Sequence, residues 1–198
     1  MSAAKFSAGW VDPSTLRWLV TSVLLLSAFP IETAVGQEGE LSEAEVLQAA
    51  RETMEAARYC FLITVDDTGQ PQARVMDPFL PDDDMRVWMG TNVHTRKVRQ
   101  IRDDSRATLA YYDATSMGYV TLVGAALMVD DPEERRKHWK PDWEAFYPGG
   151  PSSDDYVLIE FSPSRIEVMS FAHGVMGSGV FGPAVLDRKR SSWALERR

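Results

Sequence analysis

The residues with the clearest chemical potential lie between Gly90 and Gln100, in the sequence GTNVHTRKVRQ. We expect a strand to end there and a short helix to begin at Thr95, Arg96 and Lys97. The free amides of a helix N-terminus attract anions, and a hydroxyl with two cationic side chains suits a phosphate monoester. Arg74, on a neighbouring strand, would add one guanidinium. On charge alone, an ordinary solvated basic helix is the better interpretation.

The composition limits the classes of protein to consider. The chain has 198 residues, 44% of them apolar, which is enough for one domain with a core and too short for two large ones. Its net charge of -8 makes nucleic acid and acidic membrane surfaces poor partners, although a local basic cluster still binds a small anion. The single cysteine, Cys60, precludes an intramolecular disulfide and a cysteine metal cage, and we expect it to be buried.

Other polar residues offer weaker candidates for chemistry. We expect His94 to be a partly exposed turn residue, His138 to lie on the surface, and His173 to open a glycine-rich loop at 174–183. No two of these histidines have metal-ligand spacing, and the Asp82–Asp84 run lacks the ligand spacing of a calcium loop. Ser170 and the other late serines lack a nucleophile-elbow context, so the sequence gives no support for hydrolase chemistry.

The elements that must position these residues are mostly strands. Ser42 and Glu45 form a capping box, so the sequence predicts a helix over 43–58. Hydrophobic patterning and turn signals predict strands at 59–65, 71–76, 85–89, 106–112, 119–129, 156–161 and 165–171, with a last hairpin at 185–186 and 193–195. Short helices are predicted over 95–102 and after Asp131-Pro132, followed by an aromatic segment at 139–147. We expect the aromatic residues of this segment to form a small hydrophobic patch that caps the barrel; the alternative is a wall of the substrate pocket or the dimer interface. Apolar residues on both strand faces favour a mainly β, α+β barrel covered by helices or by a partner.

The N-terminal 36 residues have the pattern of a signal peptide. Arg17 precedes the uncharged stretch 18–29, Pro30 ends it, and Ala34-Val35-Gly36 supplies small residues for cleavage after Gly36. The stretch is too short to span a bilayer comfortably. The alternatives are an uncleaved anchor or a misassigned start. We therefore expect a signal peptide at 1–36, a linker and helix start at 37–48, and one domain at 49–198, exported to the periplasm or the cell exterior, or cytoplasmic if the signal is misread.

The order of these motifs resembles a known family. ARVM at 73–76, TNVHTRK at 91–97 and the strand that begins near Tyr119 resemble the FMN-binding core of the pyridoxamine-phosphate-oxidase-like split barrels. The resemblance covers about 49–171 and is closer to the general stress protein branch than to the true oxidases. It implies a mainly β, α+β split barrel with short peripheral helices, and a homodimer with FMN at its interface.

The resemblance also implies roles for individual residues. The FMN phosphate would be held by Arg74, Thr95, Arg96 and Lys97. The isoalloxazine ring would be lined by backbone around Val75 and Met76 together with Gly90 and Thr91. A contact from the partner subunit would fall near Tyr119, where the oxidases have glutamine.

The chain departs from the oxidases at substrate-binding positions. Phe79 stands where they have a lysine that binds the substrate phosphate, Met169 replaces a tryptophan, and their arginine-leucine-histidine motif is missing. Vitamin B6 oxidation is therefore not expected, whereas flavin binding is. The hypotheses are an FMN-dependent oxidoreductase acting on a small molecule, a non-catalytic flavin-binding or flavin-sequestering protein, and a sibling that binds a deazaflavin or haem.

Overall fold

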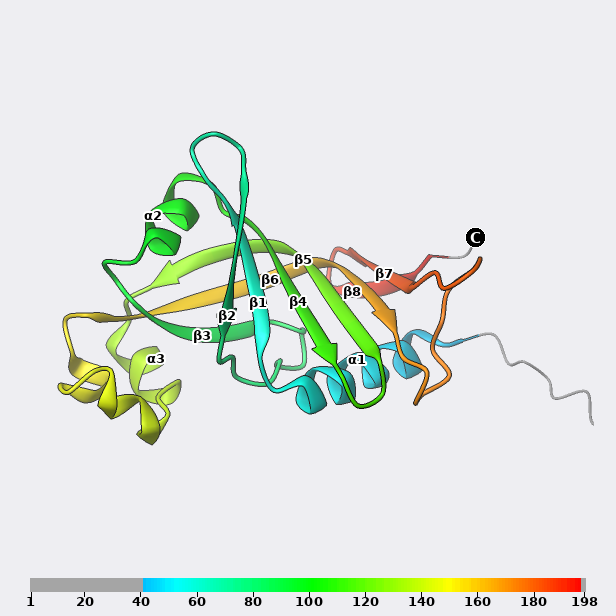
Figure 1. Cartoon of the computed structure of the whole chain (residues 1–198), viewed down its shortest axis with the longest axis horizontal. Helices are drawn as coiled ribbons and strands as arrows, with labels where there is room; N and C mark the ends of the chain where they lie inside the picture. Colours follow the sequence, from blue (N-terminus) through cyan, green and yellow to red (C-terminus); the bar gives the residue numbers. More distant parts are fainter. Residues whose placement is uncertain (1–40, 197–198) are drawn as a thin grey trace, which may run out of the picture. The chain divides into compact units, whose positions relative to one another are not determined.

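The computed structural model describes residues 41–196, which form an antiparallel sheet with three α-helices (Figure 1). The strands are β1 (Cys60–Val65), β2 (Pro71–Met76), β3 (Val87–Asn92), β4 (Arg106–Asp113), β5 (Gly118–Val129), β6 (Tyr156–Met169), β7 (Ala184–Lys189) and β8 (Ser192–Leu195). The helices are α1 (Glu43–Ala57), α2 (Arg96–Asp103) and α3 (Pro132–Lys137), with short 3-10 turns η2 (Pro141–Ala145) and η3 (Gly150–Ser152). The class is therefore mainly β, α+β, as predicted.

The sheet curls into a barrel around β6. The strand order is β2-β1-β4-β5-β6-β7-β8, and β3 pairs with the first half of β6 on the side opposite β5. A bridge between Pro78 and Met89, with Phe79 N–H donating to the Trp88 carbonyl, joins the chain after β2 to β3 and completes the circuit. Figure 1 shows α2 and α3 at one end of this arrangement and β7 and β8 at the other.

The prediction of two strands at 156–161 and 165–171 was wrong, because β6 is one strand of 14 residues. Pro163 lies between the stretch that pairs with β3 and the stretch that pairs with β7, so its missing N–H interrupts neither ladder. A register shift at Val123/Gly124 leaves Ser164 out of the residue pairing between β5 and β6, although its hydroxyl donates to the Val123 carbonyl oxygen at 3.2 Å. Gly124 is required there, since a Cβ would lie 2.1 Å from the Ser162 carbonyl oxygen.

The core follows one register row across the sheet. Leu62, Leu109, Leu122, Ile166 and Leu186 are paired in sequence from β1 to β7 and are all fully buried. Arg74 is paired with Leu62, so it extends this row at the β2 edge. The side chains that alternate with this row along each strand point outward. They include exposed apolar residues, among them Phe61 and Val75. Apolar residues thus lie on both faces of the sheet, as expected, but within residues 41–196 only the inner face is fully covered.

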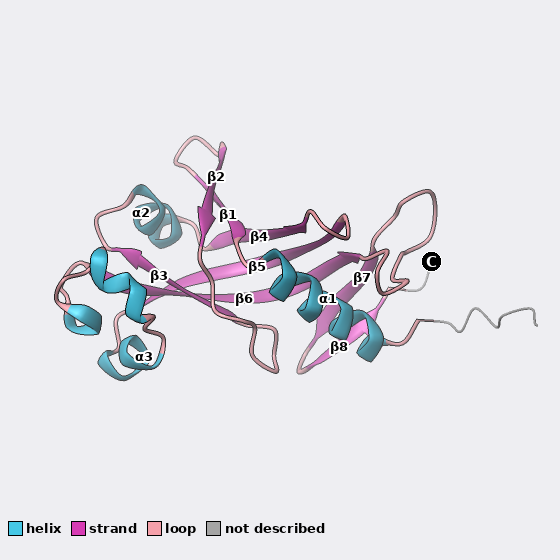
Figure 2. Cartoon of the chain, turned by 60° about the horizontal axis from the view of Figure 1, so that its bottom comes forward, coloured by secondary structure: helices cyan, strands magenta, loops and turns pink. Residues whose placement is uncertain are grey.

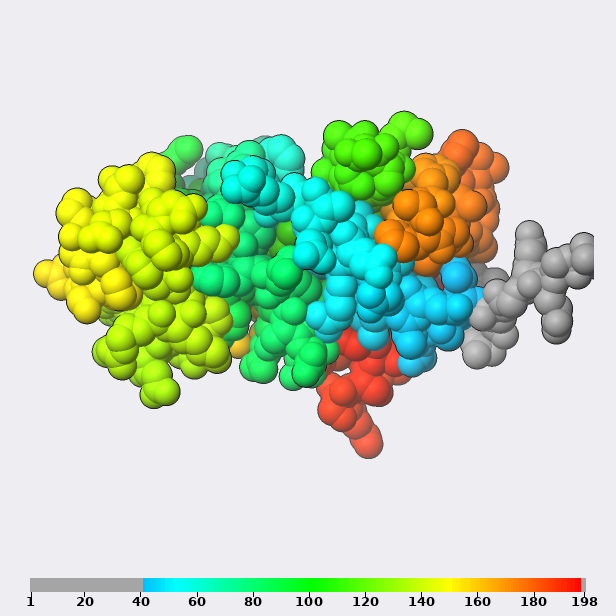
Figure 3. All heavy atoms as spheres, turned by 90° about the horizontal axis from the view of Figure 1, so that it is seen from below, coloured from blue at the N-terminus to red at the C-terminus, as the bar shows by residue number. Residues whose placement is uncertain are grey.

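Helix α1 covers the inner side of the sheet near β4 and β5 (Figures 2 and 3). The predicted capping box is confirmed: Glu45 N–H donates to Ser42 Oγ at 3.2 Å, and Ser42 N–H donates to the Glu45 carboxylate at 2.8 Å. Val46, Ala50 and Met54 recur at helical spacing and are buried against the barrel. In Figure 3, α1 occupies the middle of the visible face, between the yellow segment around 140–150 and the orange segment after β6.

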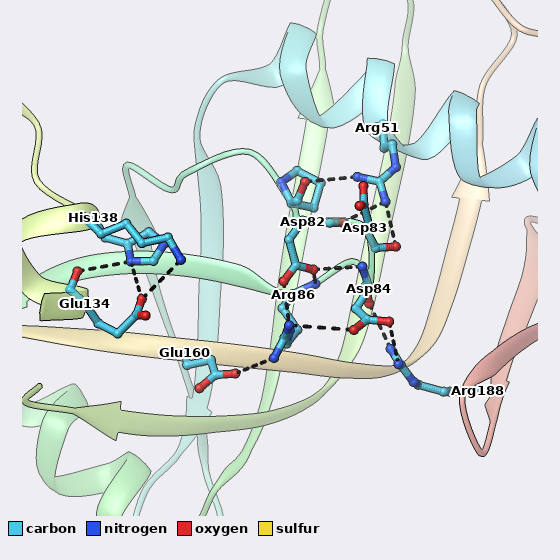
Figure 4. Close-up of polar contacts among 11 residues, drawn as sticks. Arg51, Asp82, Asp83, Asp84, Arg86, Glu134, His138, Glu160 and Arg188 are labelled. Atoms are coloured by element: carbon cyan, nitrogen blue, oxygen red, sulfur yellow. Dashed lines mark hydrogen bonds and ion pairs between the residues drawn. The ribbon is translucent and has the colours of Figure 1, made fainter.

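The turn before β3 is more ordered than the sequence suggests (Figure 4). The third strand was predicted at 85–89 and is found at Val87–Asn92, because Met85 adopts a left-handed φ of 63° in a tight turn. Arg51 of α1 donates to the Pro81 and Asp82 carbonyl oxygens at 3.0 and 2.8 Å. Arg188 of β7 pairs with Asp84 at 3.0 Å. The acidic turn is therefore tethered to two other elements rather than simply solvated.

The segment between β5 and β6 forms an aromatic cluster and corrects the expectation for His138. Asp131 caps α3 as predicted, accepting from Glu133 and Glu134 N–H groups at 2.9 Å. His138, expected on the surface, is buried, because its ring stacks on Trp88 at 4.3 Å and meets the edge of Phe79 at 5.2 Å. Desolvation lowers the pKa of His138, so this imidazole favours the neutral form.

Cys60 is buried in the core as expected, and burial raises the pKa of its thiol to about 12. The predicted last hairpin is confirmed as β7 and β8. The predicted signal peptide at 1–36, its cleavage site and the first linker residues lie outside the described residues. No helix within residues 41–196 combines the length and the apolar character needed to cross a membrane.

Candidate functional site

The hairpin of β1 and β2 and the helix α2 hold Arg74 in a fixed position. Its guanidinium donates to Thr64 Oγ1 at 2.6 Å and to Gln100 Oε1 at 2.9 Å, while the Thr64 hydroxyl also donates to Gln100 at 2.7 Å. Thr64 and Gln100 are both buried. Because these partners are neutral, they orient the guanidinium without balancing its positive charge.

Lys97 approaches the same place from the first turn of α2. Its ammonium donates to Thr91 Oγ1 at 3.0 Å, and Thr91 is buried near the end of β3. The strand–turn–helix order predicted from the sequence therefore brings Thr91 and Lys97 into contact. Because the partner is a hydroxyl, Lys97 also keeps its positive charge uncompensated.

Thr95 and Arg96 complete the start of α2. Thr95 is the N-cap, but its hydroxyl donates back to the Asn92 carbonyl oxygen at 2.9 Å and makes no capping bond to the first turn. The first turn contains no acidic residue, and Arg96 is exposed. The positive end of the helix dipole is thus combined with two cationic side chains.

The like charges of Arg74, Arg96 and Lys97 act on one another. Desolvation lowers the pKa of Arg74, and repulsion from Arg96 lowers it further. Desolvation likewise lowers the pKa of Lys97, with repulsion from Arg74 as the second cause. None of the three forms an ion pair with a carboxylate among residues 41–196, although acidic residues outnumber basic ones in the whole chain, 29 to 21. This unrelieved repulsion is what a bound anion would remove.

The other residues predicted for the site are distributed around this cationic group. On β2, Val75 points outward and is exposed, whereas Met76 points inward and is buried. Gly90 lies on the opposite phase of β3 from Thr91, and a Cβ there would fall 2.4 Å from the Trp143 ring. Tyr119 lies on the outward phase of β5, paired with Tyr112 and Met169, so it does not join Arg74 within one chain.

Sequence reasoning missed the two residues that orient Arg74. A usable signal was present for Thr64, because the hairpin register places Arg74 opposite Leu62, and Thr64 is two residues further along the same strand face. A similar signal existed for Gln100, which lies one helical turn after Arg96 and Lys97. Both were overlooked because neutral polar residues give no charge pattern.

Ser170, His173 and Glu52 are connected by contacts like those of a hydrolytic triad, but the serine is not accessible to a substrate. Ser170 Oγ lies 2.7 Å from His173 Nδ1, and His173 Nε2 lies 2.5 Å from a Glu52 carboxylate oxygen. Ser170 is fully buried, so a substrate cannot reach its hydroxyl, and its own N–H donates to the Val175 carbonyl oxygen and is not available to an oxyanion. The group instead anchors the loop after β6 to α1.

Comparison with known proteins agrees with the fold. Residues 45–182 match the family model described as "Pyridoxamine 5'-phosphate oxidase like", and the chain belongs to this family. The comparison with curated proteins gives no significant match.

Several solved structures share the architecture. A protein related to general stress protein 26 from Clostridium acetobutylicum is 21% identical with a TM-score of 0.59, and the match covers 66% of this chain and 92% of that one. General stress protein 26 from Bacillus anthracis str. Sterne is 20% identical with a TM-score of 0.55, covering 62% and 92%. A pyridoxamine 5'-phosphate oxidase-related, FMN binding protein from Nostoc punctiforme is 17% identical with a TM-score of 0.54, covering 80% and 98%. At these identities the likeness concerns the fold.

Proposed function

We propose that this chain binds FMN and acts as a flavin-dependent oxidoreductase on a small molecule. The observation that carries the proposal is the grouping of Arg74, Arg96 and Lys97 without carboxylate partners among the described residues. Family membership supports it, since a related structure is described as an FMN binding protein.

The residues present fit a phosphorylated cofactor. Arg74, Arg96 and Lys97 supply charge-assisted donors, and the N-terminus of α2 supplies amides and the positive dipole end. Thr95 would add its hydroxyl. Thr64 and Gln100 keep the Arg74 guanidinium in one orientation, so little side-chain entropy remains to be lost on binding.

When bound, a flavin supplies hydride or electron transfer at its N5. The groups that touch Arg74 and Lys97 are hydroxyls, an amide and a backbone carbonyl, none of which ionises near neutral pH. The role of these residues is therefore to bind and orient. Backbone around Val75, Met76, Gly90 and Thr91 would lie along the ring.

We also propose that the active form is a homodimer with the cofactor at its interface. Phe61 and Val75 are neighbours on the outward face of β1 and β2 and are 49% and 59% exposed. Tyr112 and Tyr119 continue the same face on β4 and β5. An exposed apolar sheet face of this kind favours burial by another subunit. Sedimentation at several concentrations tests this, and a monomer at all of them would contradict it.

Export is proposed on the signal-peptide pattern of residues 1–36. Mass spectrometry of the mature protein from a secreting host tests this proposal. A product that begins at Gln37 in the exported fraction supports it, and an intact N-terminus in the cytoplasm contradicts it.

The decisive experiment for function is to purify the protein and identify any bound coloured ligand by absorption and mass. FMN with its blue-light absorption band supports the proposal. A Soret band or a deazaflavin mass would instead favour the sibling cofactors. Bleaching of bound flavin by NAD(P)H followed by reoxidation separates an oxidoreductase from a flavin-sequestering protein, which would leave the flavin oxidised.

A further inference from the structure

A recess lies on the other side of β3 from the contact between Thr91 and Lys97. It has a volume of about 580 Å³, which is in the range of small-molecule pockets. Four of its nine lining residues are aromatic: Tyr59, just before β1, and Trp143, Phe146 and Tyr147 from the segment between β5 and β6. Gly90 and Asn92 of β3 form part of the same lining.

The aromatic wall is held rigidly before any ligand arrives. Trp143 Nε1 donates to the Asp77 carboxylate at 3.2 Å, and the Lys140 ammonium pairs with the same carboxylate at 2.7 Å. Gly90 lets the Trp143 ring lie directly on the β3 backbone. Tyr147 packs against Tyr156 at 5.1 Å. Such a wall loses little conformational freedom when a planar ring stacks on it.

The charges around the recess indicate an uncharged ligand. Asp77 is neutralised by Lys140, and the remaining charged lining residues, Arg58 and Asp142, have opposite signs. A phosphate ester would meet no group of cations comparable to that of Arg74, Arg96 and Lys97.

Phe79 points to the same conclusion. Its ring meets the edge of Trp143 at 5.7 Å and packs against the aromatic cluster that forms the wall. Phe79 therefore contributes an apolar ring and no charge to this part of the molecule.

We propose that this recess binds an uncharged planar aromatic molecule, which is the substrate class of the flavin site. The claim that this molecule is a substrate rests on the proposed function, whereas the claim that the recess binds it does not. Tyr59 and Phe146 are 46% and 75% exposed, so a ring seated between them would remove apolar surface from water that the chain leaves open.

The test is calorimetric titration of the full chain with 2-naphthol, an uncharged bicyclic ring. We expect saturable binding that Phe146→Ala weakens about tenfold, because the variant loses the stacking of one aromatic side chain on the ring. Tyr59→Ser changes a separate segment of the lining and should weaken binding similarly. Glu144→Ala, on the exposed side of η2 and outside the recess, is the matched control and should bind normally.

Three results would overturn the inference: no binding of 2-naphthol, equal binding by the wild type and both aromatic variants, or complete displacement of 2-naphthol by saturating FMN. The last would mean that the recess holds the cofactor ring. FMN titration of an Arg96→Ala/Lys97→Ala variant separates this from failure of the proposed function. If the double variant binds FMN normally while 2-naphthol binding still depends on Phe146, the phosphate site is refuted and the aromatic site stands.

Discussion

The Lys97 ammonium donates a hydrogen bond to the Thr91 hydroxyl over 3.0 Å, which ties the first turn of α2 to the end of β3. The contact fixes a cation at a strand-to-helix transition without neutralising it. Burial and the nearby Arg74 both lower the pKa of Lys97, so the fold holds the ammonium in a place that disfavours its charged form. An anion bound there would be stabilised by a charge that folding has already positioned.

Removal of the two cations of α2 should abolish tight FMN binding. Each charge-assisted hydrogen bond contributes about 1.5–3 kcal/mol, so Arg96→Ala/Lys97→Ala should weaken FMN by roughly two to four orders of magnitude. Riboflavin, which lacks the phosphate, should bind the variant and the wild type alike. Fluorescence titration measures both, with Arg99→Ala, exposed on the same helix, as the control. Unchanged FMN affinity in the double variant would refute the phosphate site.

Loss of the Thr64 hydroxyl should destabilise the protein and loosen Arg74. Thr64→Val removes the 2.6 Å acceptor of the guanidinium and one of the two donors to Gln100 Oε1, which we expect to reduce the free energy of unfolding by about 1–3 kcal/mol. FMN affinity should fall less than in the double variant. Urea unfolding checks the first effect. Thr121→Val, the same change on the outward face of β5, should be close to neutral; equal effects at both positions would contradict this account.

His138 should make stability depend on pH below its ordinary pKa of 6.5. Desolvation lowers the pKa in the folded state, so between that lowered value and 6.5 the unfolded chain binds more protons. The free energy of unfolding should therefore decrease as the pH falls through this range. His138→Phe keeps an aromatic ring beside Trp88 and does not titrate, so its decrease between about pH 7.5 and 5.5 should be smaller.

Urea unfolding at the two pH values measures the difference. The control is His94→Gln, because the His94 side chain is 78% exposed and its pairing with Asp155 at 3.3 Å is exposed too. If the free energy of unfolding of His138→Phe decreases as much as that of the wild type, groups other than His138 cause the pH dependence.

The loop after β6 should depend on His173 for its order. His173→Ala removes the links to Ser170 and Glu52, so chymotrypsin should cleave faster near the exposed Phe181. Hydrogen bonds from Gln48 and His173 lower the pKa of Glu52, so the wild-type anchor should persist in mild acid and weaken as the pH falls through that lowered value. Timed proteolysis followed by mass spectrometry detects the cut, and His94→Ala should leave its rate unchanged.

Local sequence signals predicted the elements well where capping or turn chemistry was explicit. The Ser42–Glu45 box and the Asp131-Pro132 start gave the two helices they cap, because these signals depend on residues close in sequence. The split predicted within β6 failed because Pro163 breaks a strand only where a neighbouring strand needs its N–H, and that depends on where β3 and β7 end.

The charged residues of the candidate site could be predicted from the sequence, but the neutral residues that orient them could not. Arg74 and Lys97 were proposed from the anion-binding pattern together with the family resemblance, since charge alone favoured a solvated helix. Thr64 and Gln100 matter only because three elements meet there. His138 was misplaced for a related reason: the charged residues of α3 suggested a surface, while burial came from Trp88 and Phe79, which are distant in sequence.

The inert state of Cys60 has a practical consequence. The chain has only this cysteine, and its thiol is both buried and difficult to ionise. A spectroscopic label can therefore be attached at Ala114→Cys, in the exposed turn after β4, without first deleting the native cysteine. Two labelled copies would then report their separation by dipolar spectroscopy, and so map how subunits meet in solution.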